Sequence, residues 1–224
     1  MVDLEKYQDR WNGTIKLINK YLLKKIIKKF FYNKKYNKEI FQKISKAYTK
    51  ERYYHTLRHV FYMLDNIKDF DLNNKEQAKL ELAIWFHDYI YNAQNTHNEV
   101  LSTFHFIGYA EAIGIRKKDI IEIRNLILDT KHEINPKTKL GKIICDLDLR
   151  EFVSERQPLN TEEVRKEYSH ISDEEFYKGR TEFLKSMLKK THIYHTTLYR
   201  EIFEKKAKQN LITELNNINK NGKT

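Results

Sequence analysis

Cysteine, proline and glycine are scarce in this chain: one, two and six residues of each occur among its 224 residues. The single cysteine, Cys145, forms no disulfide within the chain, which fits a reducing compartment. Few glycines and prolines disfavour a fold rich in hairpins, and strictly alternating strand-like runs are scarce. Leu, Ile, Lys and Glu dominate, so we predict an all-α fold in one domain.

Long apolar runs are also lacking. No stretch reaches the roughly eighteen apolar residues that a helix needs to cross a bilayer. The N-terminal sequence MVDLEKYQDRWNG has no apolar centre of the kind that a secretion signal contains. We therefore expect a cytoplasmic protein that has no membrane partner.

Acidic residues are outnumbered by basic ones, 31 to 42, which leaves a net charge of +11. This excess favours anionic partners such as phosphorylated molecules or nucleic acid. The densest basic patch, Lys24–Lys35, is also typical of a surface helix that turns Ile26, Ile27 and Phe30 inward. Charge alone therefore does not separate an enzyme from a nucleic-acid-binding protein.

Apolar periodicity divides the chain into helices. We expect them at about residues 3–30, 38–48, 55–70, from the following turn to 91, 97–113, 117–130, 138–152, 160–169, 173–190 and 197–218. Asp71–Asn74 is the turn, because Asn and Asp bond to their own backbone, and Asn135-Pro136 is a break. One helical domain is predicted over residues 1–218, followed by a disordered tail at 219–224.

Two of three neighbouring histidines are spaced for a shared ion. His55 and His59 stand four residues apart at the start of the expected helix 55–70, so they share one face. His87 follows at a similar distance beyond the Asp71–Asn74 turn. In an antiparallel hairpin, His59 and His87 would each lie roughly 17 Å from that turn, at about 1.5 Å per residue. One ion would then bridge the two imidazoles.

Aspartates interrupt two apolar segments. Asp88 follows His87 and five apolar residues, and an aspartate is rarely buried without a partner. Asp146 and Asp148 interrupt a second apolar run, residues 143–149. A divalent cation would be a suitable partner. Mixed imidazole and carboxylate ligands suit Mn, Fe, Co, Ni or Zn, with Mg less natural.

Five motifs in a fixed order carry a resemblance to a known family. They are Tyr54-His55-x-x-x-His59, Phe86–Tyr91, Asn98–Ser102, Thr130-Lys131-His132 and Asp146–Leu149. The chain resembles the predicted metal-dependent phosphohydrolases of the HD superfamily, whose corresponding motifs are YHxxxH, FHDxxY, NExxS, TxH and DxDL. The likeness continues through the segments Val164–Tyr168, Gly179-Arg180 and Ala207–Leu211, and thus covers most of the chain.

The resemblance implies an HD-type helical bundle in which His59, His87, Asp88 and a late aspartate bind a divalent metal ion. Asp146 is the first choice for that aspartate and Asp148 the alternative. On a helix these two point apart, so only one is expected to bind, while the other would bond to a ligand histidine. Four ligands support one ion, and two further residues, Glu99 and His132, leave room for a second.

Catalytic roles follow from the same likeness. The motif at His55 and His59 also resembles that of cyclic-nucleotide phosphodiesterases, which implies that His55 is a general acid for the leaving oxygen. Glu99 is expected to position or activate water, although the first turn of a helix favours an acid anyway. His132 is expected to contact phosphate or a second metal ion, and Lys131 to neutralise phosphate or simply to lie on the surface.

Other matches have two interpretations each. Arg165, Tyr168 and Arg180 fit the family's C-terminal pattern and would contact substrate, but salt bridges between helices explain the two arginines equally well. Tyrosines near residues 48–54 and 89–91 would stack on a base or pack in the core.

Together these inferences predict a metal-dependent phosphohydrolase that cleaves a nucleotide or another small phosphate ester or anhydride by attack of a metal-bound hydroxide. The alternatives are a non-catalytic nucleic-acid-binding protein, a ligand sensor that keeps the fold and the metal, and an oxidation at a di-iron site. The sequence leaves the substrate, the physiological metal and the oligomeric state open.

Overall fold

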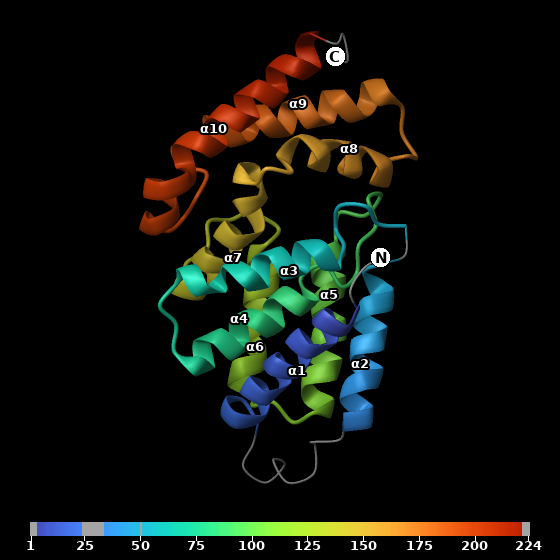
Figure 1. The fold of residues 1–224 in the computed structure, drawn as a ribbon, viewed down its shortest axis with the longest axis vertical. Coiled ribbons are helices and arrows are strands. Elements are labelled where there is room, and N and C mark those ends of the chain that lie inside the picture. Colours follow the sequence, from blue (N-terminus) through green and yellow to red (C-terminus); the bar gives the residue numbers. More distant parts are fainter. Residues whose placement is uncertain (1–3, 24–33, 50, 221–224) are drawn as a thin grey trace. The chain divides into compact units, whose positions relative to one another are not determined.

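Helices make up the architecture. The computed structural model describes residues 4–23, 34–49 and 51–220. Within these ranges the chain forms ten α-helices and two short 3-10 helices and no β-strand (Figure 1), so the all-α prediction is confirmed. Residues 24–33 of the predicted basic patch and residues 221–224 of the predicted tail lie outside the described ranges, whereas residues 219 and 220 belong to the last helix.

The chain divides into two compact units, Met1–Ile134 and Asn135–Thr224, beside the Asn135-Pro136 break. Unit 1 contains α1 (Leu4–Tyr21), α2 (Lys34–Ala47), α3 (Leu57–Asn66), η1 (Ile67–Asp69), α4 (Asn74–Phe86), α5 (Asn98–Ala112) and α6 (Lys117–Asp129). Unit 2 contains α7 (Lys139–Leu149), η2 (Arg150–Val153), α8 (Gln157–Glu167), α9 (Asp173–Lys189) and α10 (Thr197–Lys220). The sequence prediction of one domain over residues 1–218 stays a prediction.

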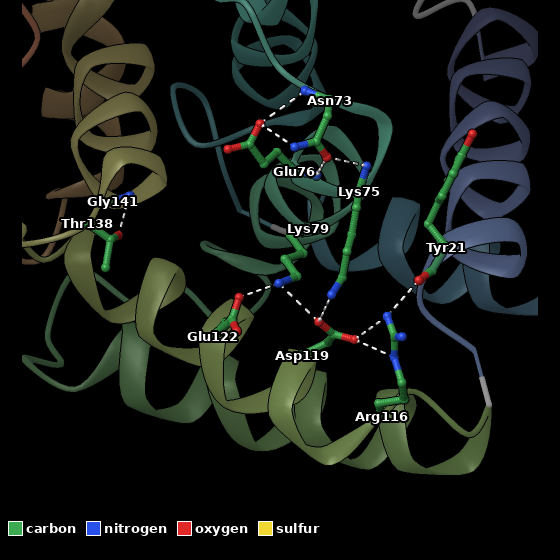
Figure 2. Close-up of polar contacts among 10 residues, drawn as sticks. All are labelled: Tyr21, Asn73, Lys75, Glu76, Lys79, Arg116, Asp119, Glu122, Thr138 and Gly141. Atoms are coloured by element: carbon green, nitrogen blue, oxygen red, sulfur yellow. Dashed lines mark hydrogen bonds and ion pairs between the residues drawn. The ribbon is translucent and has the colours of Figure 1, made fainter.

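Helix α4 is the centre of unit 1. It packs against α1, α3, α5 and α6, and every residue from Ala78 to Phe86 is buried. A capping box fixes where the helix begins: the Asn73 side chain accepts hydrogen bonds from the amides of Lys75 and Glu76, and the Glu76 carboxylate accepts one from the Asn73 amide (Figure 2). The sequence-predicted turn at residues 71–74 therefore sets the start of the helix that leads to the candidate site.

The buried glutamate of α4, Glu81, is fully paired. Its carboxylate accepts a hydrogen bond of 2.6 Å from the Thr14 hydroxyl and lies 3.0 Å from the Arg10 guanidinium. The Trp85 indole donates to the same Thr14 hydroxyl at 3.1 Å. These bonds link α1 to α4, and the Trp11 ring packs edge-on against Trp85 with centroids 5.5 Å apart. Rotation of α4 about its axis is thereby fixed.

Three basic side chains surround the buried Asp119 of α6 (Figure 2). The carboxylate oxygens lie 3.0 Å from Lys79, 3.2 Å from Lys75 and 2.7 Å from Arg116. Arg116 also donates to the carbonyl of Tyr21 at 2.6 Å. Burial raises the pKa of Asp119, but the hydrogen bonds from Lys79 and Lys75 outweigh this, so its pKa lies below the ordinary value. The network ties α4 and α6 to the end of α1.

In unit 2, Glu214 of α10 joins three helices. Its carboxylate accepts hydrogen bonds of 2.7 Å each from Gln157 and Thr161 of α8 and from Arg180 of α9. One buried carboxylate therefore connects α8, α9 and α10.

Candidate metal site

The end of α4 and the start of α3 position the predicted residues of unit 1. Helix α4 ends at Phe86, so His87 is its C-cap and Asp88 follows it. Thr56 has an extended backbone (φ −111°, ψ 175°), so α3 begins at Leu57 and His59 lies in its first turn. His55 therefore precedes the helix. The prediction that one helix face carries both His55 and His59 is wrong, because the extended backbone of Thr56 starts the helix two residues later.

His59 and His87 lie side by side in the interior. Each is 1% exposed, and their ring centroids are 5.4 Å apart. A ligand nitrogen of each ring lies within 4.8 Å of one on the other. Two nitrogens bound to one ion at about 2.1 Å are at most about 4.2 Å apart, so a small side-chain adjustment would let both bind. The predicted proximity of the two imidazoles is confirmed, while metal binding stays a prediction.

The tautomer of His87 follows from its neighbours. Nδ1 lies 2.8 Å from the carbonyl oxygen of Ile84, which only accepts, so Nδ1 carries the proton. Nε2 lies 3.0 Å from Oδ2 of Asp88, and this carboxylate is also buried. On a neutral ring the Nε2 lone pair would face a carboxylate oxygen, an arrangement of two acceptors. A second proton on the ring, or a cation bound by both groups, would remove this repulsion between two acceptors. An imidazole whose other nitrogen donates to a carbonyl is a usual metal ligand.

Arg52 holds the segment that carries Asp88. Its Nη1 donates to the carbonyl of Asp88 at 2.6 Å and its Nη2 to the carbonyl of Tyr89 at 3.0 Å. Arg52 is not among the residues that the sequence pattern indicated. Nothing in the local pattern separates Arg52 from the other basic residues, because its partners lie 36 and 37 positions away.

The motif Asn98–Ser102 closes the loop that follows Asp88. The Asn98 side chain accepts from the amide of Asn92 at 3.0 Å and donates to the carbonyls of Asn92 and Asn95 at 2.9 Å. The Ser102 hydroxyl accepts from the amide of Ile90 at 3.0 Å. These supporting roles were missed, although the motif contains both residues. Glu99 is half-buried in the first turn of α5, and its catalytic role stays a prediction.

His132 and Lys131 follow the end of α6. His132 adopts a positive φ of 57°, a conformation that is uncommon for a residue other than glycine. Burial raises the pKa of the nearby Asp129 carboxyl, while the charge of His132 acts in the opposite direction. Lys131 forms an ion pair of 2.9 Å with Glu133. The predicted phosphate contacts of His132 and Lys131 stay predictions.

The late aspartates belong to unit 2. Asp146 is completely buried, and its carboxylate accepts hydrogen bonds from the amides of His195 at 2.6 Å and Thr196 at 2.8 Å, and from the Thr196 hydroxyl. Burial raises the pKa of Asp146 to about 6, although these hydrogen bonds lower it. Asp146 therefore anchors the segment just before α10. Asp148, two residues further along α7, is half-buried.

Arg165 and Arg180 take part in contacts within unit 2. Arg165 pairs with Asp173 at 2.7 Å and donates to the carbonyls of Tyr168 and Ile171. Arg180 pairs with the Glu214 carboxylate at 2.7 Å. These bonds agree with the salt-bridge interpretation of the two arginines.

The fold and the site thus define an all-α protein in which two buried imidazoles lie beside a buried aspartate. Comparison of the chain with models of protein families, with curated proteins and with solved structures finds no match. Among the described residues, no helix combines the length and apolar character that crossing a membrane requires.

Proposed function

We propose that this protein is a metal-dependent phosphohydrolase in which His59, His87 and Asp88 hold a divalent metal ion. The observation that carries the proposal is the environment of His87. Its Nδ1 is committed to the carbonyl of Ile84, while its Nε2 lies 3.0 Å from the Asp88 carboxylate and beside a second buried imidazole. This donor set fits Mn, Fe, Co, Ni or Zn better than Mg.

For the late aspartate ligand, whose first choice from sequence is Asp146 and whose alternative is Asp148, we propose Asp148. A carboxylate has about four lone-pair sites, and Asp146 already uses three for its bonds to His195 and Thr196. Replacing those bonds would release the segment before α10. Asp146 therefore serves as an anchor in our proposal, in place of the ligand role that was the first choice from sequence.

A divalent ion held by these residues would lower the pKa of a water molecule towards neutrality and would polarise a phosphoryl oxygen. His55 would supply the proton that the leaving oxygen requires. Its ring centroid lies 6.3 Å from that of His59, so it stands next to the proposed ligands without being among them. It is half-buried, which leaves it able to exchange protons with solvent.

A small phosphorylated molecule, with a nucleotide as the first choice, is the proposed substrate. The net charge of +11 favours an anion. Tyr54 and Tyr91 flank His55 with ring centroids 4.8 and 3.9 Å from it, so aromatic surface is present where a substrate would approach. One ion is sufficient for this chemistry, and Glu99 and His132 remain the proposed contacts for a second ion or for phosphate.

The test is release of phosphate and pyrophosphate from a panel of nucleotides that includes cyclic and dinucleoside forms. Each is assayed with Mn, Co, Ni, Zn or Mg and with a chelator. His87→Ala and Asp88→Asn should abolish metal-dependent release, while His192→Ala, which changes an exposed histidine of unit 2, should not. Folded protein that releases nothing with any metal would overturn the proposal, and tight oligonucleotide binding in that case would favour the nucleic-acid-binding alternative.

A further inference from the structure

Resting on the proposed function, we infer that Tyr91 and Arg52 are positioning residues for His55. The Tyr91 ring is stacked on the His55 imidazole with centroids 3.9 Å apart and an angle of 26° between the planes. Tyr54 contacts the same imidazole edge-on, with centroids 4.8 Å apart and the planes at 85°. One face and one edge of His55 are therefore packed against aromatic rings.

His55 needs such support because no helix holds it. It lies in the irregular segment before α3, which begins at Leu57, and Glu51 in the same segment adopts a positive φ of 53°. A half-buried imidazole on irregular backbone would otherwise sample several side-chain conformations. Fixing one of them increases the fraction of molecules in which a general acid faces its substrate.

Arg52 connects this segment to the one that carries Asp88. The guanidinium donates to the carbonyls of Asp88 and Tyr89, and a longer contact of 3.5 Å reaches the carbonyl of His55. It also lies over the Tyr91 ring, 5.6 Å from its centroid. Arginine suits this position because its planar fork bonds two carbonyls at once, whereas lysine presents a single ammonium group.

The loop that carries Tyr91 is itself anchored. Asn98 and Ser102 bond to the backbone of Asn92 and Ile90, on either side of Tyr91. His55 is thus held by the segment that follows His87 and Asp88. Its distance from those proposed ligands is set by Arg52 and Tyr91 in addition to its own connection to α3.

The kinetic test compares Tyr91→Leu with the conservative Tyr91→Phe. Tyr91→Leu should lower kcat about 10- to 100-fold, because the acid is misplaced. Mn binding should stay within about twofold of the unchanged protein, since no ligand is altered. Tyr91→Phe keeps the ring and should retain most of kcat. Arg52→Lys should lower kcat in the same way and, because Arg52 also holds the carbonyl of Asp88, should weaken Mn binding as well.

A double-mutant cycle separates positioning from general damage. In a His55→Ala background, Tyr91→Leu should cause almost no additional loss of kcat, because the residue that it positions is already missing. An equal loss in both backgrounds would overturn the inference, since Tyr91 would then act independently of His55.

A measurement without turnover keeps this inference distinguishable from the proposed function. In NMR spectra of the metal-free protein, the ring protons of His55 should be shifted upfield by the stacked tyrosine. The signals are assigned with His55→Ala. The shift should disappear in Tyr91→Leu and persist in Tyr91→Phe. If no nucleotide is hydrolysed yet this pattern is seen, the hydrolase proposal fails and the positioning stands. An unchanged His55 shift in Tyr91→Leu would refute the positioning itself.

Discussion

Nε2 of His87 lies 3.0 Å from Oδ2 of Asp88, while Nδ1 of the same ring is bonded to the carbonyl of Ile84. The ring therefore points its second nitrogen at a buried carboxylate, with the His59 ring adjacent. Either a proton or a cation must lie between the nitrogen and the carboxylate oxygen. The two possibilities make opposite predictions about added metal.

Metal should stabilise the protein. Binding to the folded state alone raises the free energy of unfolding by about 2.7 kcal/mol at a metal concentration of 100 times Kd. For a chain of this size that corresponds to roughly 5–10 °C in Tm. We expect this shift with Mn, Co or Zn in thermal unfolding, its loss in His87→Ala and its retention in His192→Ala. No shift with any of these ions would favour a protonated His87 paired with Asp88.

Substitution of the two aspartates of α7 should affect different properties of the protein. Asp148→Asn is expected to weaken metal binding, whereas Asp146→Asn is expected to lower the free energy of unfolding by roughly 2–3 kcal/mol through lost bonds to His195 and Thr196. Titration calorimetry with Mn and chemical denaturation of the metal-free protein measure the two effects. If Asp146→Asn abolished metal binding while its metal-free stability was unchanged, Asp146 would be the ligand.

Asp119 should make stability depend on pH. Its pKa is lowered from an ordinary value of 3.8, so the ionised carboxylate stabilises the folded state at neutral pH. This contribution is fully present above pH 3.8 and is lost as the pH falls through the lower folded pKa. Asp119→Asn should lower the free energy of unfolding by about 3 kcal/mol at pH 7, because it removes a negative charge that neutralises the ammonium group of the buried Lys79.

The cost of Asp119→Asn should shrink in denaturation experiments as the pH falls from 3.8 through the lower pKa of the folded state, because Asp119 is protonated first in the unfolded chain and then in the folded one. Glu122→Gln is the matched control: it also contacts Lys79 but is far more exposed, and we expect less than about 1 kcal/mol. A pH-independent cost for Asp119→Asn would contradict the assigned role of its charge.

The loop after Asp88 should depend on Asn98. Asn98→Ala removes three hydrogen bonds to the backbone of Asn92 and Asn95, and should lower stability by roughly 1–2 kcal/mol. Hydrogen exchange of the loop amides should accelerate, and metal binding should weaken because Asp88 is less restrained. Gln94→Ala, at an exposed position of the same loop, is the control. Equal exchange rates in both variants would argue against this role of Asn98.

Much of the helical architecture was accessible from sequence because it depends on local pattern. Apolar periodicity located α5, α6, α9 and α10 to within a few residues, and the Asp71–Asn74 turn appears as the capping box of Asn73. The boundaries at the candidate site were less accurate. Helix α4 ends at Phe86 instead of residue 91, and α3 begins at Leu57 instead of His55. At these helix ends, long-range contacts determine the backbone conformation more strongly than helical propensity does.

By itself, the sequence determined that this protein is helical and that His59, His87 and Asp88 lie in apolar segments, because periodicity and hydrophobicity are properties of neighbouring residues. Only the tertiary structure decided that Arg52 holds the carbonyl of Asp88, 36 positions away. It likewise decided that Asp146 binds the backbone of His195, 49 positions away. Such bonds form between segments that meet only after the helices have packed, so no local pattern specifies them.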